Sequence, residues 1–476
     1  MTADIFSHIP LNVLQTVTAE QAWHYHIIPS AVKNNHLEFY IDGDQDLVQT
    51  ETELEVLFGK PVQFTPVETA SVNMALSKLY PQNRANRKVK VRQRSDDFLY
   101  ELIMEAHSIG SSDIHIESYE NESRVRFRID GKLVERYAIS RDEYPAIVNK
   151  IKIRANLDIA EKRLPQDGRI LFKEEDSNID IRVSVLPSMF GEKVVMRLLN
   201  KESTDIDINT LGFDAEQLNT YLEGTKKSHG IILISGPTGS GKTTTLYATL
   251  KVLNRTEINI LTIEDPIEYT LEGVNQVQLK EAIGLTFASA LRTFLRQDPD
   301  IIMLGEIRDA ETAQMATRAA LTGHLVLSTI HTNSALGTIS RLADMNVPGY
   351  LVASTLNLSV AQRLVRVLCP ECKSEQPFDP SNLPRHYKPA HKLEKHFIPV
   401  GCEKCYFTGY RGRKAVYEIL PVSSEIAEQI RKENLNEDFV REKTGIKFLH
   451  ESAYELFAKG ITSLEEIYPI LLTGSY

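Results

Sequence analysis

Cysteine, tryptophan and long apolar runs are scarce in this chain of 476 residues. It contains four cysteines and a single tryptophan. No run of about 18 apolar residues occurs, which argues against a membrane-spanning helix. The first residues, MTADIFSHIPLNVL, place Asp4 where a secretory signal has basic residues, and they lack a long apolar core. We therefore expect a cytoplasmic protein.

The overall charge gives little support to nucleic acid as the main partner. The formal net charge is −10 and the isoelectric point is about 5.8, whereas nucleic-acid binding usually needs a basic surface. Hydrophobic residues make up 42% and charged residues 25% of the chain, which is a globular composition. The length predicts two to four domains.

The four cysteines form two CxxC pairs and occur nowhere else: Cys369, Cys372, Cys402 and Cys405. In a reducing compartment this pattern favours a metal site over disulfides. Four thiolates suit a closed, tetrahedral, structural Zn²⁺ site. The gap between the pairs predicts a small zinc-binding insertion over residues 366–411 with its own helices. A thioredoxin-like redox pair is the alternative.

The first part of the chain divides into a small module and a basic segment. Residues 1–80 mix strand-like runs such as LEFYID with helical ones such as ETELEVLF, which predicts an α+β module. Residues 81–94 are basic and contain no acid, and their charges come from Arg84, Arg87, Lys88, Lys90, Arg92 and Arg94. This segment is either a solvated interdomain linker or a surface attracted to anionic lipid headgroups or an acidic partner.

The remainder predicts two further domains of different class. Residues 95–200 contain strand patterns in SRVRFRIDGKLVE, DIRVSVLP and KVVMRLL, and form a second α+β domain. From residue 201, apolar runs such as GIILISG and HLVLSTI alternate with helical stretches, which favours an α/β domain with a parallel sheet covered on both faces. Residues 420–476 are rich in helix formers and predict a helical tail.

The motif GPTGSGKT fills every position of a P-loop, between a predicted strand and a predicted helix. The glycines let backbone N–H groups surround phosphate oxygens, and the helix N-terminus adds positive potential. We expect Lys242 to reach the β- and γ-phosphates of ATP and the Thr243 hydroxyl to ligate Mg²⁺. The predicted nucleotide-binding residues are Gly236, Pro237, Thr238, Gly239, Ser240, Gly241, Lys242, Thr243 and Thr244.

Acidic residues follow two later strands. Glu306, at the end of IIMLGE, is our candidate general base, with a solvated acid at a strand end as the alternative. In TIEDPIEY, Glu264 or Glu268 is expected to position water or Mg²⁺, and Asp265 could equally cap a turn. A further strand between the phosphate loop and the acid is typical of RecA-like motors.

Two histidines flank the strand in TGHLVLSTIHTN. His331 is expected at the end of a strand that neighbours the acid-bearing one, and we interpret it as a γ-phosphate sensor. His324 is a weaker candidate for the same role. For both, a structural histidine is the alternative.

Several motifs together make the chain similar to the secretion ATPases of type II secretion and type IV pilus assembly. The resemblance covers about residues 90–470. It rests on SSDIHIE, LPQDGRI, DIRVSVLPSMFGEKVVMRLL, the P-loop, TIEDPIEY, IIMLGEIRD, TGHLVLSTIHTN, QRLVRVLCPEC and CEKCYFTGYRGR.

The resemblance implies a PAS-like domain over residues 95–200, joined flexibly to a RecA-like ATPase domain over residues 201–476, in a homohexamer. It implies that Arg169 and Arg182 reach the γ-phosphate from the preceding domain, and that Arg413 points into a neighbouring subunit's nucleotide site. For Arg413, a surface charge of the zinc-binding insertion is the alternative. Arg292 and Arg296 are i and i+4 and would share one helix face, with salt bridging as the alternative. Retraction motors of the family generally lack the cysteine insertion, so the cysteines favour a secretion or extension motor.

The function expected from this resemblance is a cytoplasmic motor that hydrolyses ATP to assemble pilin-like subunits. Its implied partners are an inner-membrane platform protein and the cytoplasmic domain of a membrane-anchored assembly protein, with residues 1–80 as a partner-binding module. The expected location is therefore the cytoplasmic face of the inner membrane. The alternatives are a RecA-like nucleic-acid translocase and a nucleotide-dependent scaffold that does not hydrolyse ATP.

Overall fold

The fold is described from a computed structural model of the chain. The structure describes residues 6, 9–14, 16–33, 36–43, 47–80, 95–173, 178–199, 206–389 and 391–474. The basic segment 81–94, which we predict to be a linker or an anion-attracting surface, lies outside the described residues. Among the described helices, none combines the length and the apolar character needed to cross a bilayer.

The first unit is a small α+β module with a three-stranded sheet. Its strands β1 (Ile27–Lys33) and β2 (His36–Asp42) pair antiparallel, and β3 (Val62–Val67) joins β2 in parallel. Its helices are α1 (Leu11–Leu14), α2 (Ala19–His24), α3 (Leu47–Phe58) and α4 (Thr69–Leu79). The strand predicted over LEFYID and the helix predicted over ETELEVLF are confirmed.

The second unit is an antiparallel sheet with helices on one face. The strand order is β6-β5-β4-β9-β8-β7, and apolar side chains on one face form a core with the two helices. The three strand patterns predicted from the sequence are confirmed. The elements are α5 (Ser95–Ser108), β4 (Asp113–Ser118), β5 (Ser123–Ile129), β6 (Lys132–Ile139), α6 (Tyr144–Arg154), β7 (Gln166–Lys173), β8 (Asn178–Ser188) and β9 (Gly191–Leu199).

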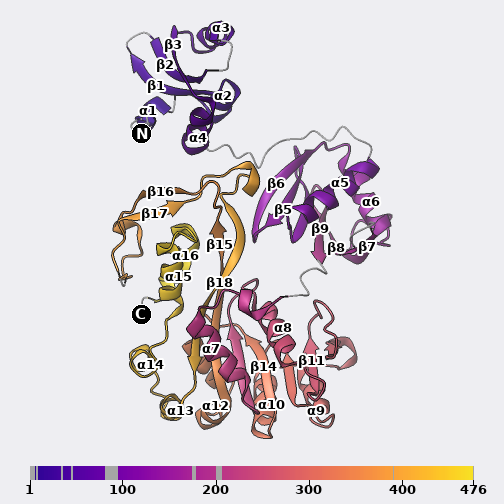
Figure 1. Ribbon diagram of the computed structural model, residues 1–476. Coiled ribbons are helices and arrows are strands. Elements are labelled where there is room, and N and C mark those ends of the chain that lie inside the picture. The colour runs from indigo at the N-terminus through magenta and orange to yellow at the C-terminus, as the bar shows by residue number, and fades with distance from the viewer. Residues whose placement is uncertain are drawn as a thin grey trace.

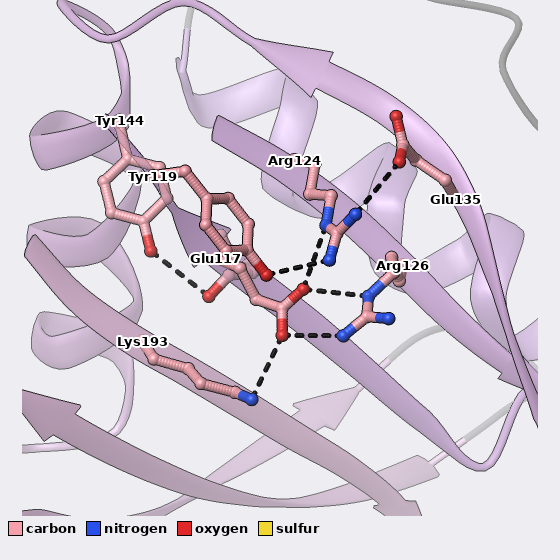
Figure 2. Close-up of polar contacts among 8 residues, drawn as sticks. Glu117, Tyr119, Arg124, Arg126, Glu135, Tyr144 and Lys193 are labelled. Atoms are coloured by element: carbon pink, nitrogen blue, oxygen red, sulfur yellow. Dashed lines mark hydrogen bonds and ion pairs between the residues drawn. The ribbon is translucent and has the colours of Figure 1, made fainter. Parts of the chain in front are cut away.

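The opposite face of this sheet is charged, and Figure 2 shows how Glu117 organises part of it. The Glu117 carboxylate accepts hydrogen bonds from Arg126 at 2.8 Å and from Arg124 at 3.2 Å, and it pairs with Lys193 at 3.0 Å. Burial alone would raise the pKa of Glu117, but the hydrogen bonds from Arg126 and Lys193 lower this pKa to about 2. These three cations are therefore already compensated within the domain.

The third unit is built on a seven-stranded sheet in the order β12-β11-β13-β14-β10-β15-β18. Its neighbouring strands are parallel except for β18, which runs antiparallel to β15. The strands are β10 (Gly230–Ser235), β11 (Ile260–Glu264), β12 (Asn275–Gln278), β13 (Ile301–Leu304), β14 (Leu325–Ile330), β15 (Leu356–Leu368) and β18 (Tyr410–Pro421).

Helices cover both faces of this sheet (Figure 1), as the uninterrupted apolar runs predict. Every residue of β10, β11, β13 and β14 is buried. One face packs against α7 (Ala215–Thr225) and α8 (Lys242–Leu253). The other packs against α9 (Phe287–Phe294), α10 (Ala310–Leu321), α11 (Ala335–Asp344) and α12 (Gly349–Thr355). The predicted parallel sheet with two covered faces is therefore confirmed.

The cysteine pairs lie in a segment between β15 and β18. In its described part the segment forms a two-stranded sheet, β16 (Ser374–Pro377) and β17 (Lys395–Ile398), with short 3-10 turns. The expectation that helices fill this gap is therefore wrong. The tail is helical, with α13 (Ser424–Arg431), α14 (Glu437–Thr444), α15 (Leu449–Ala458) and α16 (Leu464–Leu471).

Among the described residues, contacts between the second and third units occur near the P-loop and beside the cysteine segment. Near the nucleotide loop, the Arg182 guanidinium donates to the Ile267 carbonyl at 3.0 Å. Beside the cysteine segment, the Gly412 amide donates to the Asp130 carboxylate at 2.8 Å, and the Arg136 guanidinium lies over the Tyr406 ring. The first contact places an arginine of the second unit next to the loop that follows β11.

Candidate active site

The P-loop leaves β10 and leads directly into α8. Gly236, Gly239 and Gly241 have φ values of 150°, 80° and 86°, which favour glycine, and Gly241 caps a helix that begins at Lys242. A Cβ on Gly236 would lie 2.5 Å from the Gln362 carbonyl oxygen. Only glycine therefore lets the loop pass so close to β15.

Lys242 lies across the loop. Its ammonium donates to the Gly236 carbonyl at 2.8 Å and to the Pro237 carbonyl at 3.1 Å. Burial lowers the pKa of Lys242, with Glu306 acting against the shift and Arg363 adding to it. The ammonium therefore lies in a setting where a polyanion such as a triphosphate gains from binding.

Glu306 lies two residues beyond the end of β13, at the same edge of the sheet as the P-loop. Arg308 pairs with one carboxylate oxygen, and His331 Nε2 lies 3.2 Å from the other. The Glu306 side chain is 15% exposed, so one edge stays reachable while its neighbours fix its orientation. This is a suitable arrangement for a base that takes a proton from water.

The order of the sheet explains how Glu306 and His331 meet. β14 pairs in parallel with both β13 and β10, so it lies between the acid-bearing strand and the P-loop strand. The predicted neighbouring of the strands that carry His331 and Glu306 is therefore confirmed. In the sheet, β14 separates the P-loop strand β10 from the acid-bearing strand β13. In the sequence, β11 comes between β10 and β13, but in the sheet β11 lies beyond β13, away from β10.

The two acids of TIEDPIEY have different surroundings. Glu264 is buried, and its carboxylate accepts hydrogen bonds from the side chains of Tyr247, Thr262 and Gln276. Glu268 is exposed. Glu264 therefore has the environment of an orienting residue, whereas Glu268 is free to face solvent or a ligand.

His324 does not fit the sensor role. It precedes β14 at the amino end of the strand, and its Nδ1 lies 2.8 Å from the Ala319 carbonyl. His331 follows β14 at the carboxyl end, so the two are separated by six strand residues, or about 20 Å. Ligand sites of parallel sheets lie at the carboxyl ends of the strands. The structural alternative holds for His324.

Three arginines form a row across neighbouring strands of the second unit. Arg182 on β8 is the cross-strand partner of Arg169 on β7 and of Arg197 on β9. Arg169, with 64% of its side chain exposed, pairs with Asp180, and Arg197 donates to Asp113 at 2.9 Å. Within the described residues, Arg182 has no carboxylate partner and instead contacts the third unit, at the Ile267 carbonyl. The family resemblance implied the same role for Arg182 and Arg169, but their contacts in the structure differ.

The remaining predicted arginines are Arg292, Arg296 and Arg413. α9 ends at Phe294, so Arg296 lies beyond the helix and donates to the Arg292 carbonyl at 2.9 Å. The prediction of one shared helix face is therefore wrong. Arg292 pairs with Glu311, as the salt-bridge alternative expects. Arg413 is exposed on β18, and among the described residues no acid pairs with it.

The four cysteines meet at one point. Their sulfur atoms all lie within 4.8 Å of one another, and three pairs are 3.7–3.8 Å apart. Four ligands at about 2.3 Å from a tetrahedral Zn²⁺ would have sulfurs about 3.8 Å apart. The amides of Gly401, Cys402 and Gly409 also donate to these sulfurs. These hydrogen bonds favour the thiolate form, whereas burial raises the pKa of Cys372 and Cys405. The donor set therefore fits a tetrahedral metal ion.

Three residues at the site were missed from the sequence. Arg308 holds Glu306, Gln362 accepts a hydrogen bond from Thr245 of α8 at 3.0 Å, and Arg363 lies against the P-loop. Arg308 is two residues from Glu306 on the same loop, so its spacing was a usable signal. Gln362 and Arg363 lie about 120 residues beyond the P-loop and reach it only through the strand order.

Comparison with known proteins finds relatives over most of the chain. The family described as Type II/IV secretion system protein matches residues 91–469. Type II secretion system ATPase E of Vibrio cholerae is 47% identical over 371 residues, which cover 77% of this chain and 73% of that protein. Type IV pilus assembly ATPase PilB of Myxococcus xanthus is 48% identical over 374 residues, 77% of this chain and 66% of that protein.

Solved structures share the fold. The pilus retraction motor PilT, solved with bound ADP, superposes with a TM-score of 0.52 at 27% identity and covers 78% of this chain and 95% of its own. The ATPase DotB of Legionella pneumophila has a TM-score of 0.61 at 22% identity, covering 82% of this chain and all of its own, and supports the fold alone. The match over residues 91–469 and the identities to the curated relatives show that this chain belongs to the family of type II/IV secretion ATPases.

Proposed function

We propose that the chain is a motor that couples ATP hydrolysis to the assembly of pilin-like subunits, in type II secretion or in type IV pilus extension. The observation that carries this proposal is the Glu306 carboxylate held by Arg308 and His331 beside a complete P-loop. A site that only bound nucleotide would not need an oriented base. The names of the relatives support secretion or pilus assembly over a nucleic-acid translocase.

Each residue has a distinct part in the proposed hydrolysis. The P-loop amides and Lys242 hold the β- and γ-phosphates. Glu306 accepts a proton from a water molecule. The oxygen of this water attacks the γ-phosphorus, and the bond between the γ-phosphorus and the ADP oxygen breaks. His331 keeps Glu306 oriented and lies near the phosphate released. Arg182 approaches from the second unit and balances the charge that develops on the transferred group.

Mg²⁺ is the cation that these donors would suit. The Thr243 hydroxyl at the start of α8 and the Glu268 carboxylate are hard oxygen donors, which Mg²⁺ prefers. Bound with ATP, the ion would neutralise phosphate charge. Glu264 would act indirectly, because Tyr247, Thr262 and Gln276 occupy its carboxylate and fix the loop that carries Glu268.

The oligomer we propose is a homohexamer, in which Arg413 completes the nucleotide site of an adjacent subunit. The support is that Arg413 is exposed and lies on the edge strand β18, opposite Arg366 of β15. A solvent-facing guanidinium on a sheet edge can reach another subunit without rearrangement of its own domain.

The proposed partners are an inner-membrane platform protein and the cytoplasmic domain of a membrane-anchored assembly protein, and the proposed location is the cytoplasmic face of that membrane. The module of residues 1–80 would provide the contact. Adding the cytoplasmic domain of the cognate membrane-anchored assembly protein should raise phosphate release, whereas adding DNA should have no effect. Stimulation by DNA alone would instead support the translocase.

We propose Zn²⁺ as the metal of the cysteine site, with a structural role. The purified chain should release about one zinc per chain when its thiols are titrated. The double change Cys402→Ser and Cys405→Ser should remove the zinc and lower the melting temperature by several degrees, because the segment that leads into β18, whose Gly412 contacts Asp130, loses its crosslink. Lys404→Gln, between the two cysteines, is the control. A native chain without zinc and with four free thiols would contradict the site.

A further inference from the structure

Arg363 lies against the P-loop although no nucleotide motif includes it. β15 pairs in parallel with β10 as far as Ala361 opposite Ser235, so the next two residues continue beside the loop that leaves β10. A Cβ on Gly236 would lie 3.2 Å from Arg363 Nη1. The guanidinium therefore touches the first glycine of the phosphate loop, from the side opposite β14.

The hydrogen bonds of Arg363 go only to neutral groups. Nη1 donates to the Gln362 carbonyl at 3.0 Å, and Nη2 lies 3.0 Å from the Asn333 carbonyl and 3.2 Å from its side-chain oxygen. In the part of the chain that the structure describes, no acid forms an ion pair with it. These contacts use three of the five N–H donors of a guanidinium. A half-buried cation in this state is suited to an anionic ligand.

The position of Arg363 indicates which part of the ligand it would meet. Asn333, which accepts two of its hydrogen bonds, is two residues after His331, and His331 contacts the base Glu306. The Arg363 charge also adds to the lowering of the Lys242 pKa, so the two cations act on one another. Arg363 is therefore linked through Asn333 to the loop whose His331 contacts the base, and it shares the P-loop with Lys242.

We infer that Arg363 binds the γ-phosphate of ATP within its own subunit and so makes the site prefer ATP over ADP. This inference rests on the proposed ATP site and deepens it. The Arg363 guanidinium donates to Asn333, which lies in the loop that also carries His331. Binding of the γ-phosphate by Arg363 would therefore be linked to the position of that histidine. The competing role is structural, in which Arg363 only joins β15 to the P-loop and to Asn333.

The test compares the affinities of the full chain for a fluorescent nonhydrolysable ATP analogue and for fluorescent ADP. Arg363→Gln should weaken the analogue about 10- to 100-fold, as expected for the loss of a charge-assisted hydrogen bond, and should leave ADP binding near the wild-type value. Arg363→Lys keeps the charge without the planar fork and should give an intermediate loss. Arg318→Gln, at an exposed position on α10, is the matched control.

Each outcome bears on the inference. An unchanged ratio of the two affinities, or an equal loss for both nucleotides, would overturn it and leave the structural role. If Arg363→Gln lowers the melting temperature of the nucleotide-free protein, the two affinities are compared for Arg363→Lys instead. An unchanged ratio of the affinities for the ATP analogue and for ADP in Arg363→Lys would then overturn the inference. A wild-type chain that binds neither nucleotide would instead contradict the proposed function itself.

Discussion

Arg182→Gln is expected to lower the turnover of ATP by at least about 100-fold, because a guanidinium that balances transition-state charge contributes a factor of this order or more. Arg182 contacts the Ile267 carbonyl of the ATPase domain, and among the described residues no acid forms an ion pair with it. The affinity of the Arg182→Gln variant for ATP should change little, since the phosphates are held mainly by the P-loop. The measurement is steady-state phosphate release together with equilibrium nucleotide binding.

The matched control is Arg169→Gln, one strand away. Arg169 is the direct cross-strand partner of Arg182, but it is exposed and its guanidinium is engaged by Asp180. We therefore expect a loss of only a few-fold. A severe loss in Arg169→Gln with a mild one in Arg182→Gln would reverse the assignment. Equal and severe losses would mean that domain closure brings both arginines to the phosphate.

The local parts of the site could be predicted from the sequence. The P-loop needs only consecutive residues, and Gly236 and Lys242 lie six residues apart. Glu306 follows an apolar run whose four residues are all buried in β13. The carboxyl ends of parallel strands meet at one edge of a sheet, so the approach of Glu306 to the P-loop followed from the pattern. The same rule, applied to β14, would have excluded His324 as a γ-phosphate sensor, because it precedes the strand, and would have retained His331, which follows it.

The non-local parts could not be predicted. Arg363 reaches Gly236 because β15 lies next to β10, and nothing in the local pattern of β15 reveals that neighbour. The ion pair of Arg169 with Asp180 depends on the register of β7 against β8. The prediction that helices fill the cysteine segment was also wrong. A metal site supplies structural restraint, so the long gap between the cysteine pairs does not need helices to be stable.

Glu306→Gln is expected to abolish most of the hydrolysis while ATP binding persists. A general base contributes about 10²- to 10⁴-fold to a rate, and glutamine keeps the shape of the side chain but cannot accept the proton. Arg308 can still donate to the amide oxygen, and the amide nitrogen can donate to His331 Nε2, so the local fold should survive. The control is Glu272→Gln, an exposed residue of the loop before β12.

The most direct test of this site is single-turnover phosphate release from bound ATP, measured for the wild-type chain and for Glu306→Gln. The proposed mechanism predicts that both bind ATP with similar affinity, that the wild type releases phosphate, and that the variant releases it at least about 100-fold more slowly. Equal rates for the two proteins would contradict the account, because the base would then have to be a different group.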